Sequence, residues 1–218
     1  MKTLLWSCTL FLIASTFATA QSFQASAKLY TNLLLSEPLP ELFDYEGNSA
    51  VRFKVTPAFH LYSEEKWKYH ELEISNLRFK NHERQLEDVR ETLVGLRYEY
   101  GWVMDMNTGI DGLQLMLGIS SRFFYHRQAF SPNISNELEE SETAIKAIIG
   151  LVPRANYRIN DQFSLDFNIS VSSLSVGTER QYFNNPFLTG QSRVQSNFNT
   201  DFLFIDDVTL RLGIVYQL

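Results

Sequence analysis

The sequence has few of the residues that cross-link, bend or break a chain. A single cysteine, Cys8, among 218 residues excludes a disulfide framework and a zinc site built from cysteines. Ten glycines and six prolines are too few for a disordered or collagen-like chain. Charged residues make up 20%, and acidic residues outnumber basic ones by 25 to 19, so the basic stripe of a nucleic-acid-binding protein is missing. We therefore expect no nucleic-acid partner.

Long apolar runs are also rare, and the one at the amino terminus has the features of a secretory signal peptide. Lys2 supplies the positive start, residues 4–17 are apolar, and the Ala-Thr-Ala at residues 18–20 gives the small-x-small pattern that signal peptidases cleave. The run is shorter than the ~20 residues of a spanning helix, and no comparable run follows. We predict a signal peptide at residues 1–20 and a mature domain at residues 21–218, without a membrane helix.

The mature chain is rich in alternation of apolar and polar residues with a period of two. Clear alternation covers residues 51–61, 94–104, 113–122, 145–154, 163–172, 198–204 and 208–218. Residues 25–35 alternate more weakly, and residues 67–79 change phase between Tyr69 and Leu72 and again before Leu77, which indicates a bulge. This period predicts β-strands, and the runs are longer than the ~5–6 residues of ordinary strands.

Short and long connections alternate along the chain. Short turns are expected at residues 63–66, 107–109 and 159–161, and longer loops at residues 36–49, 81–91, 127–142 and 177–192. This order places the tight turns at one end of a barrel and the long loops at the other. Transmembrane β-barrels have the same asymmetry.

The face that points outward decides between a membrane barrel and a water-soluble one. The polar face is rich in Ser, Asn, Gln and Gly, which suits a crowded interior, and the apolar face is too bulky for an eight-stranded interior. A Lys or Arg facing hydrocarbon at the midplane would cost about 2–4 kcal/mol, so the strand charges are expected to point inward. The predicted interior network comprises Arg52, Lys54, Arg97, Glu99, Arg122, Lys146, Arg154, Asp166, Asp201 and Arg211.

The strand count depends on how the chain ends. Residues 205–207 look like the turn at residues 159–161, and counting both as turns gives nine strands, whereas bacterial barrels have an even number. Even-numbered positions stay in phase from residue 194 to residue 218, so one long final strand would restore eight. We predict an all-β, antiparallel up-and-down transmembrane β-barrel of eight strands. Ten is the alternative if residues 177–192 contain another hairpin.

The final strand carries the resemblance to a known class. Apolar side chains occupy every second position of residues 208–218, including Tyr216, although the chain closes on Leu218 instead of the usual aromatic residue. Together with the cleavage region, this pattern resembles small Gram-negative outer-membrane β-barrels of the OmpA-like and OmpX-like kind and the Bacteroidota β-barrel domain family. The resemblance implies location in the bacterial outer membrane, insertion by the barrel-assembly machinery, and contact with outer-membrane lipid and lipopolysaccharide. We expect a monomer.

No motif predicts catalysis. His60 and His126 fall on the polar face, and His70 and His82 lie in or near the bulged strand. Ser120 shares a face with His126 but is about 20 Å away along the strand, too far for proton transfer. We expect no enzyme activity, catalytic residue, cofactor or metal site. The alternatives left open are an outer-membrane hydrolase or lipid-modifying enzyme, and a periplasmic lipocalin-like carrier.

The long loops are acidic and offer a second predicted site. Its interaction residues are Glu37, Glu41, Asp44, Glu46, Glu137, Glu139 and Glu140. Such carboxylates can bind divalent cations that bridge surface lipopolysaccharide, or a basic partner, and a simple solvated loop is the alternative. The expected function is that of a non-enzymatic barrel with a side-chain-filled polar interior and a role in envelope structure or surface interaction.

Overall fold

A computed structural model of the chain describes residues 24–35, 55–63, 67–83, 87–104, 109–132, 140–183, 194–202 and 208–218. These ranges contain β1 (Gln24–Leu35), β2 (Val55–Ser63), β3 (Lys68–Glu83), β4 (Glu87–Met104), β5 (Leu113–Pro132), β6 (Glu140–Arg158), β7 (Phe163–Phe183), β8 (Val194–Phe202) and β9 (Val208–Gln217). Within them, no helix is long and apolar enough to cross a membrane. The predicted signal peptide lies outside the described residues.

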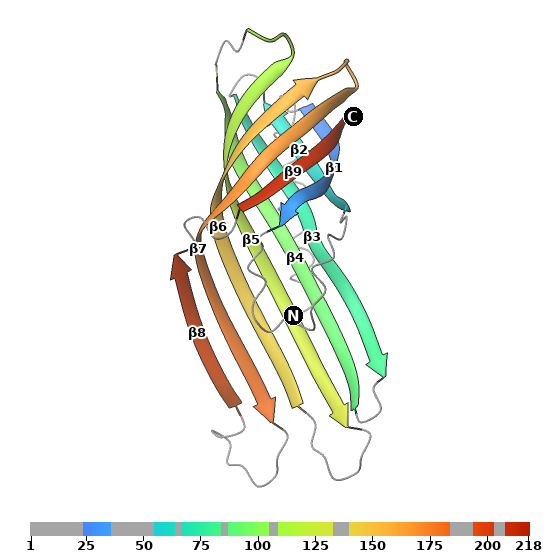
Figure 1. Cartoon of the computed structure of the whole chain (residues 1–218), viewed down its shortest axis with the longest axis vertical. Helices are drawn as coiled ribbons and strands as arrows, with labels where there is room; N and C mark the ends of the chain where they lie inside the picture. Colours follow the sequence, from blue (N-terminus) through green and yellow to red (C-terminus); the bar gives the residue numbers. More distant parts are fainter. Residues whose placement is uncertain are drawn as a thin grey trace, which may run out of the picture.

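Eight of these strands close into an antiparallel barrel (Figure 1). Strands β1 to β7 pair in chain order, and β9 pairs with both β7 and β1, which completes the ring. Each ring strand therefore has a partner strand on both sides, although the pairing of β2 with β3 covers only Lys68–Glu73 of β3. The predicted all-β, antiparallel barrel of eight strands is confirmed.

The last two strands share β7 as their partner. β9 pairs with β7 from Phe163 to Val171, and β8 pairs with it from Leu174 to Tyr182. Both run antiparallel to β7, so they follow one another along its edge (Figure 1). The predicted single long final strand is therefore divided into two, but the number of strands in the ring remains eight.

Strands extend into three of the predicted long loops. β3 reaches Glu83, β4 begins at Glu87, β5 reaches Pro132, β6 begins at Glu140, and β7 reaches Phe183. These extensions continue the wall of the barrel beyond the ring on the side of the long connections (Figure 1). The polar residues of these segments suggested loops, but strand pairing satisfies the backbone even where both faces of a sheet carry polar side chains.

Side chains of the ring alternate between an apolar outer face and a polar interior. The outward-pointing Ile119 and Phe167 are 44% and 37% exposed, whereas their neighbours Ser120 and Asp166 are 1% and 0% exposed. A water-soluble barrel would show the opposite arrangement. The predicted assignment of sides is confirmed.

The bulged strand is β3, and one of its two predicted phase changes is wrong. The pairing of β3 with β4 shifts register between Ile74 and Asn76, which accounts for the phase change before Leu77. No break separates Tyr69 from Leu72, because Tyr69 is a fully buried aromatic residue on the interior face. Because Tyr69 is an aromatic residue in a row of polar inward side chains, the alternation in the sequence looks as if it changes phase there.

Candidate functional site

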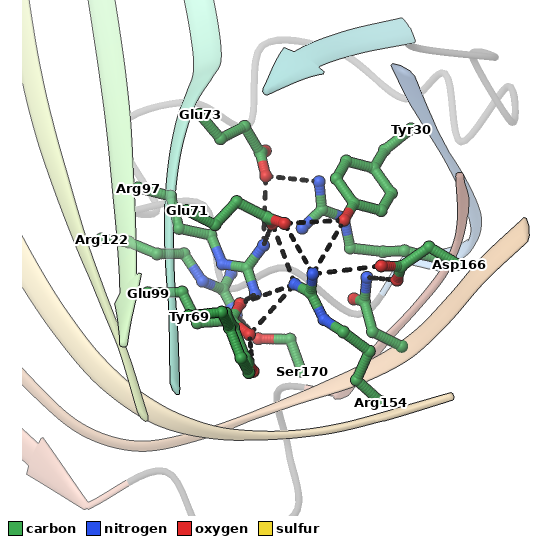
Figure 2. A network of polar contacts seen from close by, with 12 residues as sticks. Tyr30, Tyr69, Glu71, Glu73, Arg97, Glu99, Arg122, Arg154, Asp166 and Ser170 are labelled. Atoms are coloured by element: carbon green, nitrogen blue, oxygen red, sulfur yellow. Dashed lines mark hydrogen bonds and ion pairs between the residues drawn. The ribbon is translucent and has the colours of Figure 1, made fainter. Parts of the chain in front are cut away.

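A cluster of ion-paired side chains occupies the interior of the ring (Figure 2). This interior cluster consists of Lys28, Arg97, Arg154 and Arg211 together with Glu71, Glu73, Glu99 and Asp166. Its members come from β1, β3, β4, β6, β7 and β9, and none is more than 4% exposed. The four cations and four anions balance, and their mutual attraction offsets part of the hydration that is lost on burial.

Arg154 on β6 is the hub of the interior cluster. Its Nη1 lies 2.6 Å from Glu71 Oε2 and 3.1 Å from Asp166 Oδ2. Its Nη2 lies 3.0 Å from Glu99. These three carboxylates belong to β3, β7 and β4, so one planar guanidinium ties together four strands.

The other cations complete the pairing of the carboxylates. Lys28 Nζ lies 2.8 Å from Asp166 and 3.0 Å from Glu71. Arg97 bonds to Glu99 and, at 3.1 Å, to Glu73, which also accepts a bond from Arg211. Each carboxylate of the interior cluster therefore meets at least two cations.

Two buried tyrosines connect to the interior cluster through their hydroxyl groups. Tyr30 donates to Glu71 at 3.0 Å and accepts from Arg154 at 3.1 Å, while the Arg211 guanidinium lies 4.2 Å from its ring centre. Tyr69 donates to Glu99 at 2.6 Å. Both rings add apolar bulk to the interior while their hydroxyl groups remain hydrogen-bonded.

Inward-facing glycines make room for these rings. A Cβ added at Gly213 would lie 2.5 Å from the Tyr30 ring, and one added at Gly101 would lie 2.4 Å from the Tyr69 ring. At Gly118 the Tyr69 hydroxyl would be 2.5 Å away. The glycines of the polar face thus serve close packing inside the barrel, as their sequence positions suggested.

The eight residues of the predicted network that the structure describes fall into three groups. Arg97, Glu99, Arg154, Asp166 and Arg211 lie in the interior cluster. Arg122 lies beside it and donates to Ser170 at 2.7 Å and Ser172 at 3.2 Å. Lys146 is half-buried on β6, and Asp201 is exposed on β8, which pairs with β7 beyond the closed ring. The prediction that Asp201 meets the interior cations is therefore wrong.

Several predicted residues lie outside the described ranges. They are Arg52 and Lys54 of the network, and Glu37, Glu41, Asp44, Glu46, Glu137 and Glu139 of the acidic loops. Glu140 is described and is exposed at the first position of β6. Among the described residues, no group of three or more His, Cys, Asp or Glu could hold a metal ion.

Sequence reasoning missed three of the eight members of the interior cluster. Lys28 lies on the weakly alternating first strand, and Glu71 and Glu73 lie on the bulged strand, where the apparent phase change obscured which positions point inward. The even positions of residues 24–30 offered a usable signal, because Ser26, Lys28 and Tyr30 form one continuous polar row.

Two histidines are enclosed within the barrel. His60 is 5% exposed, with Nδ1 3.3 Å from Glu71 Oε2 and its ring stacked on Tyr69 at 5.2 Å. His126 is 2% exposed, with Nε2 3.5 Å from Glu91. The alternative of a hydrolase needs a rim histidine that is open to substrate, and neither of these two rings has that exposure.

A small polar cavity of about 40 Å³ lies between the interior cluster and the short-turn end. Its lining includes Ser26, Lys28, His60, Gln114 and Asn156. A space of this size admits water and is far smaller than the pockets of about 300–1,000 Å³ that hold organic ligands.

Comparison with known proteins gives only distant likenesses. No family model and no curated protein matches the chain. It is similar to a major outer membrane protein from Thermus thermophilus, with 10% identity and a TM-score of 0.49 over 91% of this chain and 100% of that one. It is also similar to Neisserial surface protein A, with 11% identity and a TM-score of 0.32 over 90% and 96% of the two chains. Because these likenesses are distant, the fold assignment rests on the strand pairing of the chain itself.

Proposed function

We propose that the chain is a non-enzymatic integral outer-membrane β-barrel, closed by its own side chains, with a structural or surface-interaction role in the envelope. Its outer face supports membrane insertion. On β5 the outward side chains from Leu115 to Tyr125 are apolar except for Ser121, over about 33 Å of strand at ~3.3 Å per residue. With a strand tilt of about 40°, this stretch spans about 25 Å along the barrel axis, the height of the apolar band in transmembrane barrels.

The interior cluster is the observation that carries the proposal. Eight buried charges surround the barrel axis while aliphatic and aromatic side chains cover the outside. Water would drive a soluble protein to bury its apolar side chains and hydrate its charges. A lipid environment reverses the choice of outer face, so this arrangement favours a membrane-embedded barrel over a lipocalin-like carrier with an apolar cavity.

The same cluster argues for a closed interior. An eight-stranded barrel is just wide enough for side chains to fill. Here Arg154 and Glu71 meet from strands on different sides of the ring, and Lys28, Tyr30 and Tyr69 pack around them. A wide aqueous path of the general-porin kind is not compatible with this packing.

Membrane fractionation tests the location. The full chain, expressed in a Gram-negative host, is expected in the outer-membrane fraction and in solution only after detergent extraction. On a gel, the unboiled sample is expected to migrate differently from the boiled sample, which serves as its own unfolded control. Release by osmotic shock without detergent would contradict the proposal.

Conductance in planar bilayers tests the closed interior. After insertion of the purified barrel, no large and stable single-channel conductance is expected, with a known general porin as the positive control. Large, long-lived steps from this protein would reject the closed interior while leaving its membrane location intact.

The surface-interaction role rests on the acidic residues of the long connections. Glu137, Glu139 and Glu140 supply carboxylates near the start of β6, where Glu140 is exposed. Calorimetric titration with Ca²⁺ should show binding that is lost when all three become Gln. Binding that persists in this variant would move the role away from this connection.

A further inference from the structure

Three arginines project outward on the side of the long connections. Arg90 on β4, Arg127 on β5 and Arg180 on β7 are all exposed. Arg127 and Arg180 pair with the same residue, Thr143 of β6, from opposite sides, which places their backbones about 10 Å apart. Arg90 pairs with Ala129, two residues from Arg127 on the same face of β5.

These outward arginines, Arg90, Arg127 and Arg180, stand at the margin of the apolar band. Across β4 to β7, the paired outward row that includes Arg127 and Arg180 also contains Thr92 and Thr143 and is polar, and it meets an exposed Phe79 only on β3. The next outward row toward the ring contains Val94, Tyr125, Ile145 and Thr178, and it is mainly apolar. The level of the arginines is therefore the level at which hydrocarbon gives way to lipid headgroups.

Two acidic side chains close to these arginines, Glu91 on β4 and Glu142 on β6, face the other side of the sheet. Glu91 points inward toward His126, at 3.5 Å, and Glu142 accepts a hydrogen bond from Gln181 on the inner face. The outward acid nearest to Arg90 on its own strand is Asp88, which is half-buried and one outward position further from the apolar band. Separation of arginine to the outside and glutamate to the inside leaves a positive outer surface at the headgroup level.

We infer that Arg90, Arg127 and Arg180 bind the phosphate groups of an anionic lipid in the leaflet on the long-connection side. The guanidinium fork matches phosphate oxygens with two parallel hydrogen bonds. The hydroxyl of Thr143, between Arg127 and Arg180, adds a further donor. This inference rests on the proposed membrane location and specifies the lipid chemistry that the outer surface selects.

The test compares two variants in vesicles of phosphatidylcholine doped with lipid A, a phosphorylated glycolipid. One variant carries R90Q, R127Q and R180Q together. The control variant carries R158Q, which removes an exposed arginine at the short-turn end that is paired with Asp161. Native mass spectrometry of the extracted barrel counts retained lipid A, and gel mobility without boiling confirms that each variant is folded.

Wild type and R158Q are expected to retain lipid A equally, and the triple variant is expected to lose about fivefold in affinity per arginine removed. Unchanged retention by the folded triple variant, or equal loss in R158Q, would overturn the inference without touching the membrane location. Competition by inorganic phosphate as effective as that by lipid A would identify a site for free phosphate and also overturn it. A chain that never enters vesicles would instead refute the proposed function.

Discussion

Arg154 of β6 and Glu71 of β3 meet inside the barrel, with Nη1 2.6 Å from Oε2 and Nη2 2.9 Å from Oε1. β6 and β3 are not neighbours in the ring, so this bidentate pair connects separate parts of the wall. Backbone pairing cannot supply such a link, because each strand bonds only to the strands beside it. The pair therefore acts as an internal brace and blocks the axis at the same point.

Replacing Arg154 with Met should strongly destabilise the barrel. The change removes the shared partner of Glu71, Glu99 and Asp166 and leaves buried carboxylates with fewer cations. Breaking one side of a buried ion pair costs about 3–5 kcal/mol. Urea unfolding of the detergent-solubilised barrel, followed by gel mobility, measures the loss. Arg158→Met, at an exposed turn, is the control and should leave the midpoint unchanged.

Replacing Tyr30 with Phe should have a smaller effect that isolates one hydroxyl group. The ring and its contact with Arg211 remain, but Glu71 loses a donor and Arg154 an acceptor. Leaving a buried polar group with one bond fewer costs about 1–3 kcal/mol. The same unfolding assay checks this. Tyr30→Leu should cost more than Tyr30→Phe, and equal midpoints for the two variants would show that the hydroxyl alone matters.

The sequence predicts the barrel well because its outer face is read directly from parity. Ile119 and Phe167 fall on the outward face, and Asp166 on the inward one, without any knowledge of strand pairing. The same rule failed at Tyr69. The rule assumes that every aromatic side chain of a strand points outward, and Tyr69 is an aromatic residue that points into the barrel. Gly101 and Gly118 make that exception feasible, and they lie on other strands, so no local pattern reveals it.

The site was harder to predict than the fold. That Arg154 meets Glu71 depends on how the ring closes, which alternation along one strand does not encode. The ends of the strands were also misjudged. Residues 81–83 and 87–91 are polar enough to suggest a loop, yet β3 and β4 pair through them, because outside the apolar band neither face of the sheet needs to be apolar.

Replacing Gly101 with Ala tests the packing of the tyrosines against glycine. The new Cβ would lie 2.4 Å from the Tyr69 ring and 2.6 Å from the Leu117 carbonyl oxygen, so the ring or the backbone has to move. Overpacking of this kind costs about 1–3 kcal/mol. Gly177→Ala is the matched control, since the nearest atom there is 3.5 Å away. Equal unfolding midpoints for the two variants would show that Tyr69 adjusts freely and that the glycine is not needed for packing.

A single substitution on the outer face can show whether lipid or water surrounds the barrel, because the two environments predict different effects on stability. Ile119 lies outward near the middle of the apolar stretch of β5 and is 44% exposed. Ile119→Arg would place a charge in hydrocarbon, at a cost of about 2–4 kcal/mol near the midplane. In water, the same change at an exposed position would fall within about 0.5 kcal/mol of neutral.

Ile110→Arg provides the matched control for this variant. Ile110 is 57% exposed in the connection before β5, outside the apolar band, so the same chemical change should be tolerated there. The measurement is the fraction of each variant that folds into vesicles with heat-sensitive gel mobility, together with its urea midpoint. Lipid around the barrel predicts a loss for Ile119→Arg alone. If both variants fold as well as wild type and remain soluble without detergent, water surrounds the apolar face and the proposed membrane location is wrong.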